Sequence, residues 1–380
     1  MAVNLGALLV PIVDESADER TPWLVEALEL RFQPTKRGLI VETRSHRVAT
    51  HFLRVAEFEL WIGDIEEQLQ LTLGRRLAHA AAESEEWRQS AADRESPKPF
   101  FKRKQKQLEW ANEDLQLRGL GSLELLSASD KSAKLLVRDR AHPAIAAGIA
   151  TSMWEKLTDK RYRFHWTDDG ASESLITLEL DSRSIPAAET VDGRWQNAEG
   201  IDGEMEGMHP LSLARHEGLG NWTIDGERIM SLSQDLIVRF EETALPHLTD
   251  KARRAEPVCE WEGVTDSERV KLWDAFAEAS RNRFIASGEM VLVAEPEHWV
   301  HVGHRFLSRT GLGGVDTAET LDEHGGVRLT LKSVFHPAMT VGTLLGAWER
   351  AEARPASVRW SQGRSGHIVE LRPRHDIAKN

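Results

Sequence analysis

Three histidines at intervals of three residues, His298, His301 and His304, form a group whose residue type and spacing suggest chemistry. Imidazole nitrogens are common ligands of zinc and other transition metals, and on a helix His298 and His301 could share a face. The flanking Trp299 and Val300 are equally compatible with a strand, which would place neighbours three apart on opposite faces. No carboxylate at a familiar ligand spacing accompanies the three histidines. They are therefore weak metal candidates, ordinary histidines are favoured, and the sequence identifies no cofactor.

Two further histidines and four tryptophans are candidates for contact with a ligand, because each has a counterpart 194 residues along the chain. Each of these histidines precedes a proline and is expected to be extended. Its imidazole could cap the start of the following helix, which we favour, or face a ligand there. Tryptophan rings fill cores or line pockets for flat, apolar ligands, and core packing is the commoner role. The pairs are His142 and His336, Trp154 and Trp348, and Trp166 and Trp360.

These residues belong to an internal repeat. Seven of the 25 positions in residues 142–166 recur at the same offset of 194, far more than unrelated segments share. Upstream, the run Gly119–Gly121 matches Gly311–Gly313. The repeat predicts that the chain holds two tandem copies of one domain, which pack together as an internal pseudo-dimer.

Length and composition agree with two domains. The chain has 380 residues, and single cores stop growing at roughly 250–300 residues. Residues 181–220 are rich in Gly, Asp, Glu and Ser, as linkers are. The irregular region from Glu83 to Lys106 contains two prolines and is expected to be an exposed insertion. We expect a first copy over residues 1–185, with an insertion at about 83–110, a linker over 186–220 and a second copy over 221–380.

Each copy is predicted to contain a strand, a helix and a hairpin. The helix begins at Pro143 or Pro337, because proline suits a first helical turn. Gly148 and Gly342 lie inside the helix, which indicates close approach of another backbone or of a ligand. In residues 161–166 apolar and polar side chains alternate, so this sheet is antiparallel with one covered face. Helices on one face of such a sheet make an α+β fold.

Several functional classes are disfavoured by composition. The net charge of −13 argues against a nucleic-acid binder, which needs cations to displace phosphate counterions. Cys259 is the only cysteine, so the chain has no internal disulfide or cysteine-rich metal site, and a cytoplasmic location is expected. No apolar stretch has the length of a transmembrane span. The sequence contains no phosphate-binding loop, dinucleotide fingerprint, nucleophile elbow or zinc-protease motif, so nothing in it identifies an enzyme.

The repeated unit, from the helix at Pro143 through the alternating strand and Asp169-Gly170, resembles the 4-vinyl-reductase-like small-molecule-binding domain. That family is related in fold to haem-based nitric-oxide-binding domains and to small subunits of the transport-particle (TRAPP) vesicle-tethering complex. The resemblance covers about residues 119–180 and 311–372. It implies dimer formation and an apolar pocket for hydrocarbon-like or aromatic ligands. Many members bind zinc through cysteines near the final hairpin, but Thr167–Ser174 and Ser361–Gly366 have none, so a zinc site is not implied.

The sequence therefore predicts a non-enzymatic binding or sensor protein for an apolar or aromatic small molecule. The candidate ligand contacts are the paired tryptophans and histidines. One alternative is a metal-binding protein or enzyme that uses His298, His301 and His304. Another is an assembly or scaffold subunit that binds a protein partner and no ligand.

Overall fold

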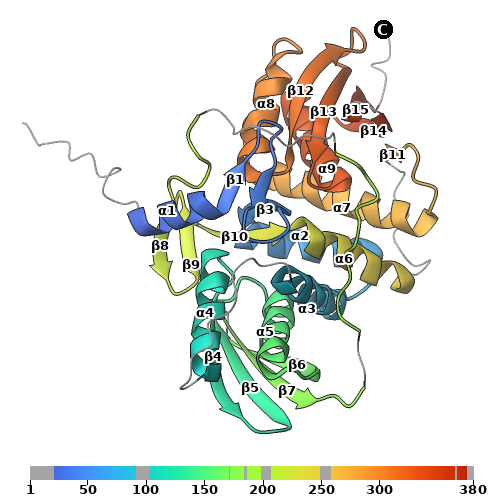
Figure 1. Cartoon of the computed structure of the whole chain (residues 1–380). Coiled ribbons are helices and arrows are strands. Elements are labelled where there is room, and N and C mark those ends of the chain that lie inside the picture. The colour runs from blue at the N-terminus through green and yellow to red at the C-terminus, as the bar shows by residue number, and fades with distance from the viewer. Residues whose placement is uncertain are drawn as a thin grey trace, which may run out of the picture.

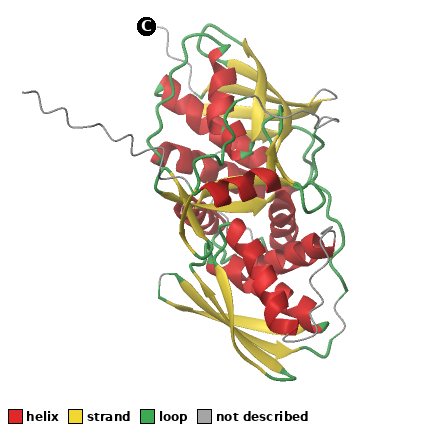
Figure 2. Cartoon of the chain, turned by 60° about the vertical axis from the view of Figure 1, so that its left-hand side comes forward, coloured by secondary structure: helices red, strands yellow, loops and turns green. Residues whose placement is uncertain are grey.

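The computed structural model describes residues 21–90, 103–170, 172–183, 186–197, 207–248, 258–363 and 366–374. Helices pack with three mostly antiparallel sheets, so the fold belongs to the α+β class, as predicted. In Figure 1 and Figure 2 two of the sheets lie at opposite ends of the molecule, with most helices between them. The α-helices of the described ranges are α1 (Pro22–Arg31), α2 (Val55–Leu69), α3 (Gly74–Ser90), α4 (Arg103–Leu117), α5 (Pro143–Thr158), α6 (Gln234–Ala244), α7 (Ser267–Ala286), α8 (His298–Phe306) and α9 (Pro337–Glu352).

The central sheet has six strands in the order β1-β2-β3-β10-β9-β8. Its two middle strands pair antiparallel, with Phe52 opposite Ser231, and each runs directly into a helix, α2 or α6. The first half of the chain (residues 21–183) supplies three strands of this sheet, and the second half (residues 207–374) supplies the other three. The strands are β1 (Phe32–Pro34), β2 (Ile40–Glu42), β3 (Ala49–Arg54), β8 (Arg215–Gly218), β9 (Asn221–Ile224) and β10 (Glu227–Ser233). Because β8 belongs to this sheet, part of the predicted linker over residues 186–220 is a strand.

The two outer sheets have the same strand order, β4-β5-β7-β6 in the first half and β12-β13-β15-β14 in the second, where β11 adds a parallel strand beside β14. The pair α3 and α5 packs beside the first sheet, and the pair α7 and α9 beside the second (Figure 1). The strands are β4 (Ser122–Ala128), β5 (Ser132–Arg138), β6 (Tyr162–Asp169), β7 (Glu173–Leu180), β11 (Cys259–Trp261), β12 (Gly313–Thr320), β13 (Val327–Val334), β14 (Ala356–Gly363) and β15 (Gly366–Pro373).

The halves also exchange helix contacts. Helix α2 of the first half packs on α7 of the second, and α6 of the second half packs on α3 of the first. Gly119 and Gly311 occupy equivalent places at this junction: a Cβ atom on Gly119 would lie 2.2 Å from the Ile229 carbonyl oxygen, and one on Gly311 would lie 2.3 Å from that of Thr50. Each glycine thus lets its segment approach a central strand contributed by the other half.

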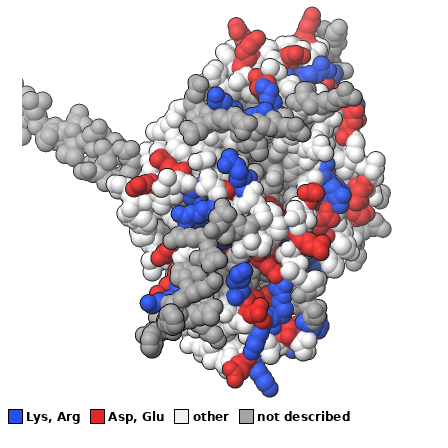
Figure 3. All heavy atoms as spheres, viewed as in Figure 1, with Lys and Arg blue, Asp and Glu red and all other residues white. Residues whose placement is uncertain are grey.

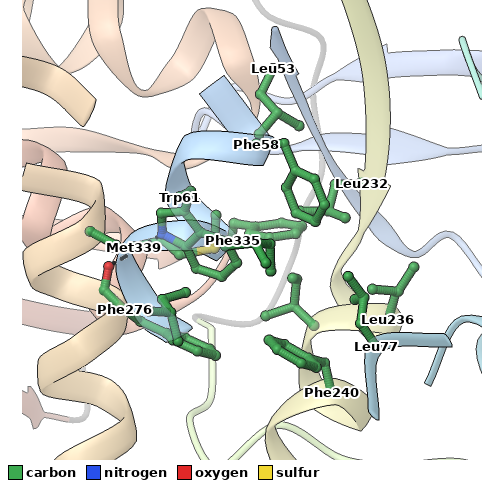
Figure 4. Packing of buried hydrophobic residues seen from close by; sticks show 14 of the residues in the cluster. Leu53, Phe58, Trp61, Leu77, Leu232, Leu236, Phe240, Phe276, Phe335 and Met339 are labelled. Atoms are coloured by element: carbon green, nitrogen blue, oxygen red, sulfur yellow. Dashed lines mark hydrogen bonds between the residues drawn. The ribbon is translucent and has the colours of Figure 1, made fainter. Parts of the chain in front are cut away.

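The apolar core crosses the junction. Buried side chains form one continuous cluster through both halves and a smaller cluster beneath α1. Figure 4 shows how Trp61 of α2 meets Phe276 of α7 at a ring-centroid distance of 4.9 Å, with Phe240 of α6 stacked on the same phenyl ring at 6.0 Å. The Trp61 indole N–H also donates to Ser280 Oγ at 3.0 Å. The two halves therefore share one core.

Gly148 and Gly342 allow the helix pairs beside the outer sheets to pack closely. A Cβ atom would lie 2.1 Å from the Ala78 carbonyl oxygen at Gly148, and 2.1 Å from that of Ala277 at Gly342. We expect Gly342→Ala, and equally Gly148→Ala, to lower the free energy of unfolding by about 1–3 kcal/mol, because backbone atoms must shift. Chemical denaturation measures this change. In the control Gly63→Ala no atom lies near the added methyl, so helix propensity should raise stability by up to about 1 kcal/mol.

If Gly148→Ala and Gly342→Ala behave like Gly63→Ala, the close contact of the helices is not what these positions require.

Candidate functional site

The three spaced histidines lie on α8, which is a helix and not a strand, and all three are exposed. His298 Nδ1 accepts a hydrogen bond from the Ala294 backbone N–H at 3.1 Å, so its ring is used where α8 begins. Among the residues with described positions, no group of three or more His, Cys, Asp or Glu side chains is arranged to hold a metal ion.

His142 and His336 stand at the N-cap positions of α5 and α9, with the extended backbone predicted from the following prolines. His336 caps its helix, because its Nδ1 accepts from the Ala338 backbone N–H at 3.2 Å. His142 makes no such bond and instead meets the Phe58 ring edge-on at 5.4 Å. Burial, aided by the charge of Arg140, lowers the pKa of His142 to about 4. The two repeated histidines therefore have different surroundings.

Three of the four repeated tryptophans are buried or half-buried on the repeated helices and strand. Trp154 is buried on α5, and Trp348 is buried on α9. The indole N–H of Trp348 donates to the Gly325 carbonyl oxygen at 3.1 Å. Trp166 is half-buried on β6 and stacks on Phe164 at 6.2 Å. These positions agree with the core role that is commoner for tryptophan.

Trp360 and His336 belong to a larger aromatic group in the second half. Trp273 of α7 lies 5.6 Å from Trp360 and 5.4 Å from His336 between ring centroids. Trp261 of β11 meets Trp273 edge-on at 5.2 Å, and Trp195 meets His336 at 4.9 Å. We call this group the tryptophan–histidine cluster. Its members are Trp195, Trp261, Trp273, His336, Trp360 and His367.

A buried carboxylate lies against this cluster. Glu241 Oε2 of α6 is 3.2 Å from His336 Nε2, and Oε1 accepts from the Trp273 indole N–H at 3.0 Å and from the Arg269 guanidinium. Burial would raise the pKa of Glu241, but the hydrogen bond and charge of His336, with Arg269, outweigh it and lower the pKa. The site thus contains a carboxylate whose charge Arg269 balances.

Some polar atoms of the cluster have no hydrogen-bond partner among the described residues: Trp360 Nε1, His367 Nδ1 and, on neighbouring β13, Ser333 Oγ. Trp360, His367 and Ser333 are almost completely buried. His367 Nε2 lies 3.1 Å from Asn197 Oδ1, which also accepts the Val334 backbone N–H. Because a carbonyl oxygen only accepts, Nε2 carries the proton and Nδ1 is left as an unused acceptor. Burial lowers the pKa of His367 to about 4, so the ring is neutral at neutral pH.

The segment of residues 186–197, which we call the covering segment, lies over this cluster without helix or strand structure. Near its start, the Glu189 carbonyl oxygen accepts from Arg239. At its end, Asn197 exchanges two hydrogen bonds with the Val334 backbone, at 2.9 and 3.1 Å. Between these two anchors Trp195 packs its ring against His336 and Trp273.

A second buried polar group holds elements of the first half together. Arg88 Nη2 lies 2.7 Å from Glu85 and 2.5 Å from Asp114, and Arg118 Nη2 lies 2.8 Å from Glu85. Arg31 and Glu42 complete the group, which has three positive and three negative side chains. It borders a cavity of about 20 Å³, the room of about one water molecule. Because the charges balance, we assign this group a structural role.

The expected exposed insertion at about residues 83–110 needs correction in its described parts. Residues 83–90 are the last turns of α3, where Glu85 and Arg88 are buried in the charged group, and residues 103–110 belong to α4. Sequence reasoning missed this because charged side chains usually indicate a solvated surface, whereas these pair with each other. Residues 91–102, with both prolines, lie outside the described ranges.

Comparison with known proteins adds no relative: no family model, curated protein or solved structure matches this chain. No helix in the described part of the chain is long and apolar enough to cross a membrane. On the face drawn in Figure 3, lysines and arginines lie among aspartates and glutamates. The resemblance to the 4-vinyl-reductase-like family stays a prediction.

Proposed function

We propose that this chain is a non-enzymatic binding protein for a flat, largely apolar small molecule, with its site at the tryptophan–histidine cluster of the second half. The observation that carries the proposal is the pair of buried, unpartnered polar atoms, Trp360 Nε1 and His367 Nδ1, among aromatic rings. Buried polar atoms nearly always have a hydrogen-bond partner. Each buried donor or acceptor without a partner lowers the stability of the fold by about 1–3 kcal/mol. A bound molecule would supply the missing partners.

The rings support a flat ligand. Trp273 and Trp360 lie 5.6 Å apart at an interplanar angle of 78°, and Trp261 lies 6.2 Å from Trp360. Aromatic side chains arranged in this way offer both ring faces and ring edges to a planar molecule. Pockets for small molecules are typically lined by such rings with a few polar groups.

The polar residues of the cluster support binding over catalysis. His336 and Glu241 resemble a base with its orienting carboxylate, but His336 Nδ1 is occupied by the Ala338 N–H and Nε2 faces Glu241. Glu241 in turn is held by Arg269 and Trp273. A general base needs a nitrogen or oxygen within reach of the substrate, and both side chains are engaged inside the protein.

The architecture suggests how the site arose. We propose that the halves descend from duplication of one domain and pack as an internal pseudo-dimer, which the shared strand order and the matched contacts of Gly119 and Gly311 support. Membership of the 4-vinyl-reductase-like family would be consistent with an apolar ligand. The single, half-buried Cys259 is compatible with the cytoplasmic location that we propose.

Naphthalene, a flat hydrocarbon, tests whether the cluster binds such molecules. We expect saturable quenching of tryptophan fluorescence with one site per chain, and mass spectrometry of natively purified protein to reveal a co-purified apolar compound. Trp360→Leu should weaken naphthalene binding by about fivefold, because a stacked aromatic face is worth about 1 kcal/mol. The matched control Trp348→Leu removes a buried indole of α9 that is not part of the cluster, so it should leave binding unchanged.

Circular dichroism must show that both variants are folded. If Trp348→Leu weakens binding and Trp360→Leu does not, the ligand lies at Trp348 of α9 and not at the tryptophan–histidine cluster. If no compound co-purifies and no flat aromatic probe binds, with or without hydrogen-bonding groups, the binding proposal is wrong and the assembly-subunit alternative gains support.

A further inference from the structure

The unpartnered atoms of the cluster define which hydrogen bonds a ligand must make. Trp360 Nε1–H can only donate, so it requires an acceptor. His367 Nδ1 is an acceptor, because its Nε2 carries the ring proton toward Asn197, so it requires a donor. The ligand must therefore present both an acceptor and a donor. A hydrocarbon would satisfy neither atom.

The two atoms belong to neighbouring strands on the covered face of one sheet. Trp360 pairs with Val369, two residues along β15 from His367, and the two rings stack with centroids 5.9 Å apart. Ser333 lies two residues along β13 from Leu331, the residue that pairs with His367. Its hydroxyl can donate or accept. The strand pairing therefore places a donor, an acceptor and a hydroxyl in one region of the sheet.

The electrostatics favour a neutral ligand. Glu241 keeps its negative charge inside the site, as its lowered pKa indicates, and Arg269, which pairs with it, also contacts Glu242. An anionic ligand would therefore lie near a carboxylate whose cationic partner is already engaged. Bringing an uncompensated charge into such surroundings is costly. The site therefore suits an uncharged molecule.

Trp195 packs its ring inside the cluster. Its indole is only 7% exposed and meets His336 edge-on at 4.9 Å and Trp273 at 6.3 Å. The other five rings of the cluster lie on helices or strands or at the N-cap of α9. Trp195 is carried by the covering segment. Between the anchors at Glu189 and Asn197, this part of the segment is held by three exposed contacts: Gln362 donates to the Gln196 carbonyl oxygen, Trp87 donates to Thr190 Oγ1, and Arg194 pairs with Glu242. Each involves a side chain, so Trp195 can leave the cluster without breaking the hydrogen bonds of a helix or strand.

We propose that the cluster binds a neutral aromatic ring system that carries both a hydrogen-bond donor and an acceptor, as an aromatic lactam does, and that Trp195 occupies the ring position until the ligand displaces it. The lactam carbonyl accepts from Trp360 Nε1–H, and the lactam N–H donates to His367 Nδ1. This inference rests on the proposed function and narrows its ligand class.

The test compares three bicyclic probes in wild-type protein and in Trp195→Ala: the lactam carbostyril, naphthalene and naphthoate. Calorimetry measures each affinity. Emptying the ring position should strengthen carbostyril binding by at least about tenfold. In Trp195→Ala, carbostyril should bind about tenfold more tightly than naphthalene, because it satisfies buried atoms that naphthalene leaves unpaired. Naphthoate, which is anionic, should bind more weakly than carbostyril.

Two further variants keep the outcomes distinct. Adding Trp360→Phe to Trp195→Ala keeps a ring but removes the N–H, so it should reduce the preference for carbostyril, because only the bond to His367 remains, and preserve naphthalene binding. Trp23→Ala, in the exposed part of α1, controls for the loss of one tryptophan. Equal affinity for carbostyril and naphthalene would overturn the lactam assignment and leave the proposed function intact. Equal carbostyril affinity in wild type and Trp195→Ala would overturn the role of Trp195. Absence of binding by every probe would overturn the proposed function itself.

Discussion

Glu85→Gln is expected to lower the free energy of unfolding by about 3–5 kcal/mol, the effect of removing one partner from a buried ion pair. Glu85 receives two hydrogen bonds from Arg88, at 2.7 and 3.2 Å, and one from Arg118 at 2.8 Å. The amide keeps the shape of the side chain but not its charge. The three guanidinium groups of Arg31, Arg88 and Arg118 would then share two anions, Asp114 and Glu42. Urea denaturation measures the loss.

The control is the same substitution at an exposed ion pair. Glu124 lies 3.1 Å from Arg138, and about half of each side chain is exposed. Glu124→Gln should change stability by less than about 1 kcal/mol, because solvent screens such pairs. Equal effects at Glu85 and Glu124 would show that burial adds nothing to the charged group.

The same group predicts how stability depends on pH. Burial would raise the pKa of Glu85, but Arg118 and Arg88 outweigh it and lower the pKa from 4.5 to about 2. A carboxyl whose pKa is lower in the folded state stabilises the fold above its unfolded pKa. That contribution is lost as pH falls from about 4.5 toward 2. Asp114, whose pKa is also lowered by Arg31 and Arg88 despite its burial, adds to the loss in the same direction. In Glu85→Gln the decline of unfolding free energy over this window should be shallower.

Local patterns in the sequence predicted the elements that depend on neighbouring residues. Pro143 and Pro337 mark the first residues of α5 and α9 because proline restricts its own backbone and that of the preceding histidine. Alternation predicted the covered and exposed faces of β6, where Tyr162 and Phe164 are buried. The helix glycines predicted a close contact, since a glycine inside a helix is unfavourable without one.

The tryptophan–histidine cluster could be predicted only where it coincides with the repeat, at His336 and Trp360. Gly148 contacts Ala78 and Gly342 contacts Ala277, so Trp273, four residues before Ala277, corresponds to Gly74 in the first half. By strand pairing, His367 corresponds to Ser174, because Val369 faces Trp360 as Ile176 faces Trp166. A search for repeated residues passes over such positions. Trp273 and His367, whose counterparts are Gly74 and Ser174, join the repeated His336 and Trp360 to form the cluster in the second half.

Trp195 could not have been found by periodicity, because it lies in a segment with no regular structure. Its neighbours in space come from α7 and from the start of α9, far along the chain. Composition gave the one available signal: the chain has 13 tryptophans and a single tyrosine. Such an imbalance favours heavy aromatic packing but does not show where the rings meet.

Phe276→Ala is expected to lower the free energy of unfolding by about 3–5 kcal/mol, the usual cost of emptying a buried phenylalanine site. Phe276 lies on α7 and is completely buried between Trp61 of the first half and Phe240 of α6. Because this core is continuous, the loss should reach both halves in one cooperative transition. Hydrogen exchange of amides in β5 and β7 should accelerate as much as exchange in β13 and β15.

Leu60→Ala on α2 is the control, since its side chain is 60% exposed and the change should stay within about 0.5 kcal/mol. If β5 and β7 keep wild-type protection in Phe276→Ala while β13 and β15 lose it, the halves unfold as separate domains. That outcome would contradict the interlocked arrangement, in which β3 pairs with β10 and helices α2 and α6 pack on the opposite halves. Under that arrangement neither half has a complete core alone. We therefore expect the two halves to unfold together and not as two independently stable domains.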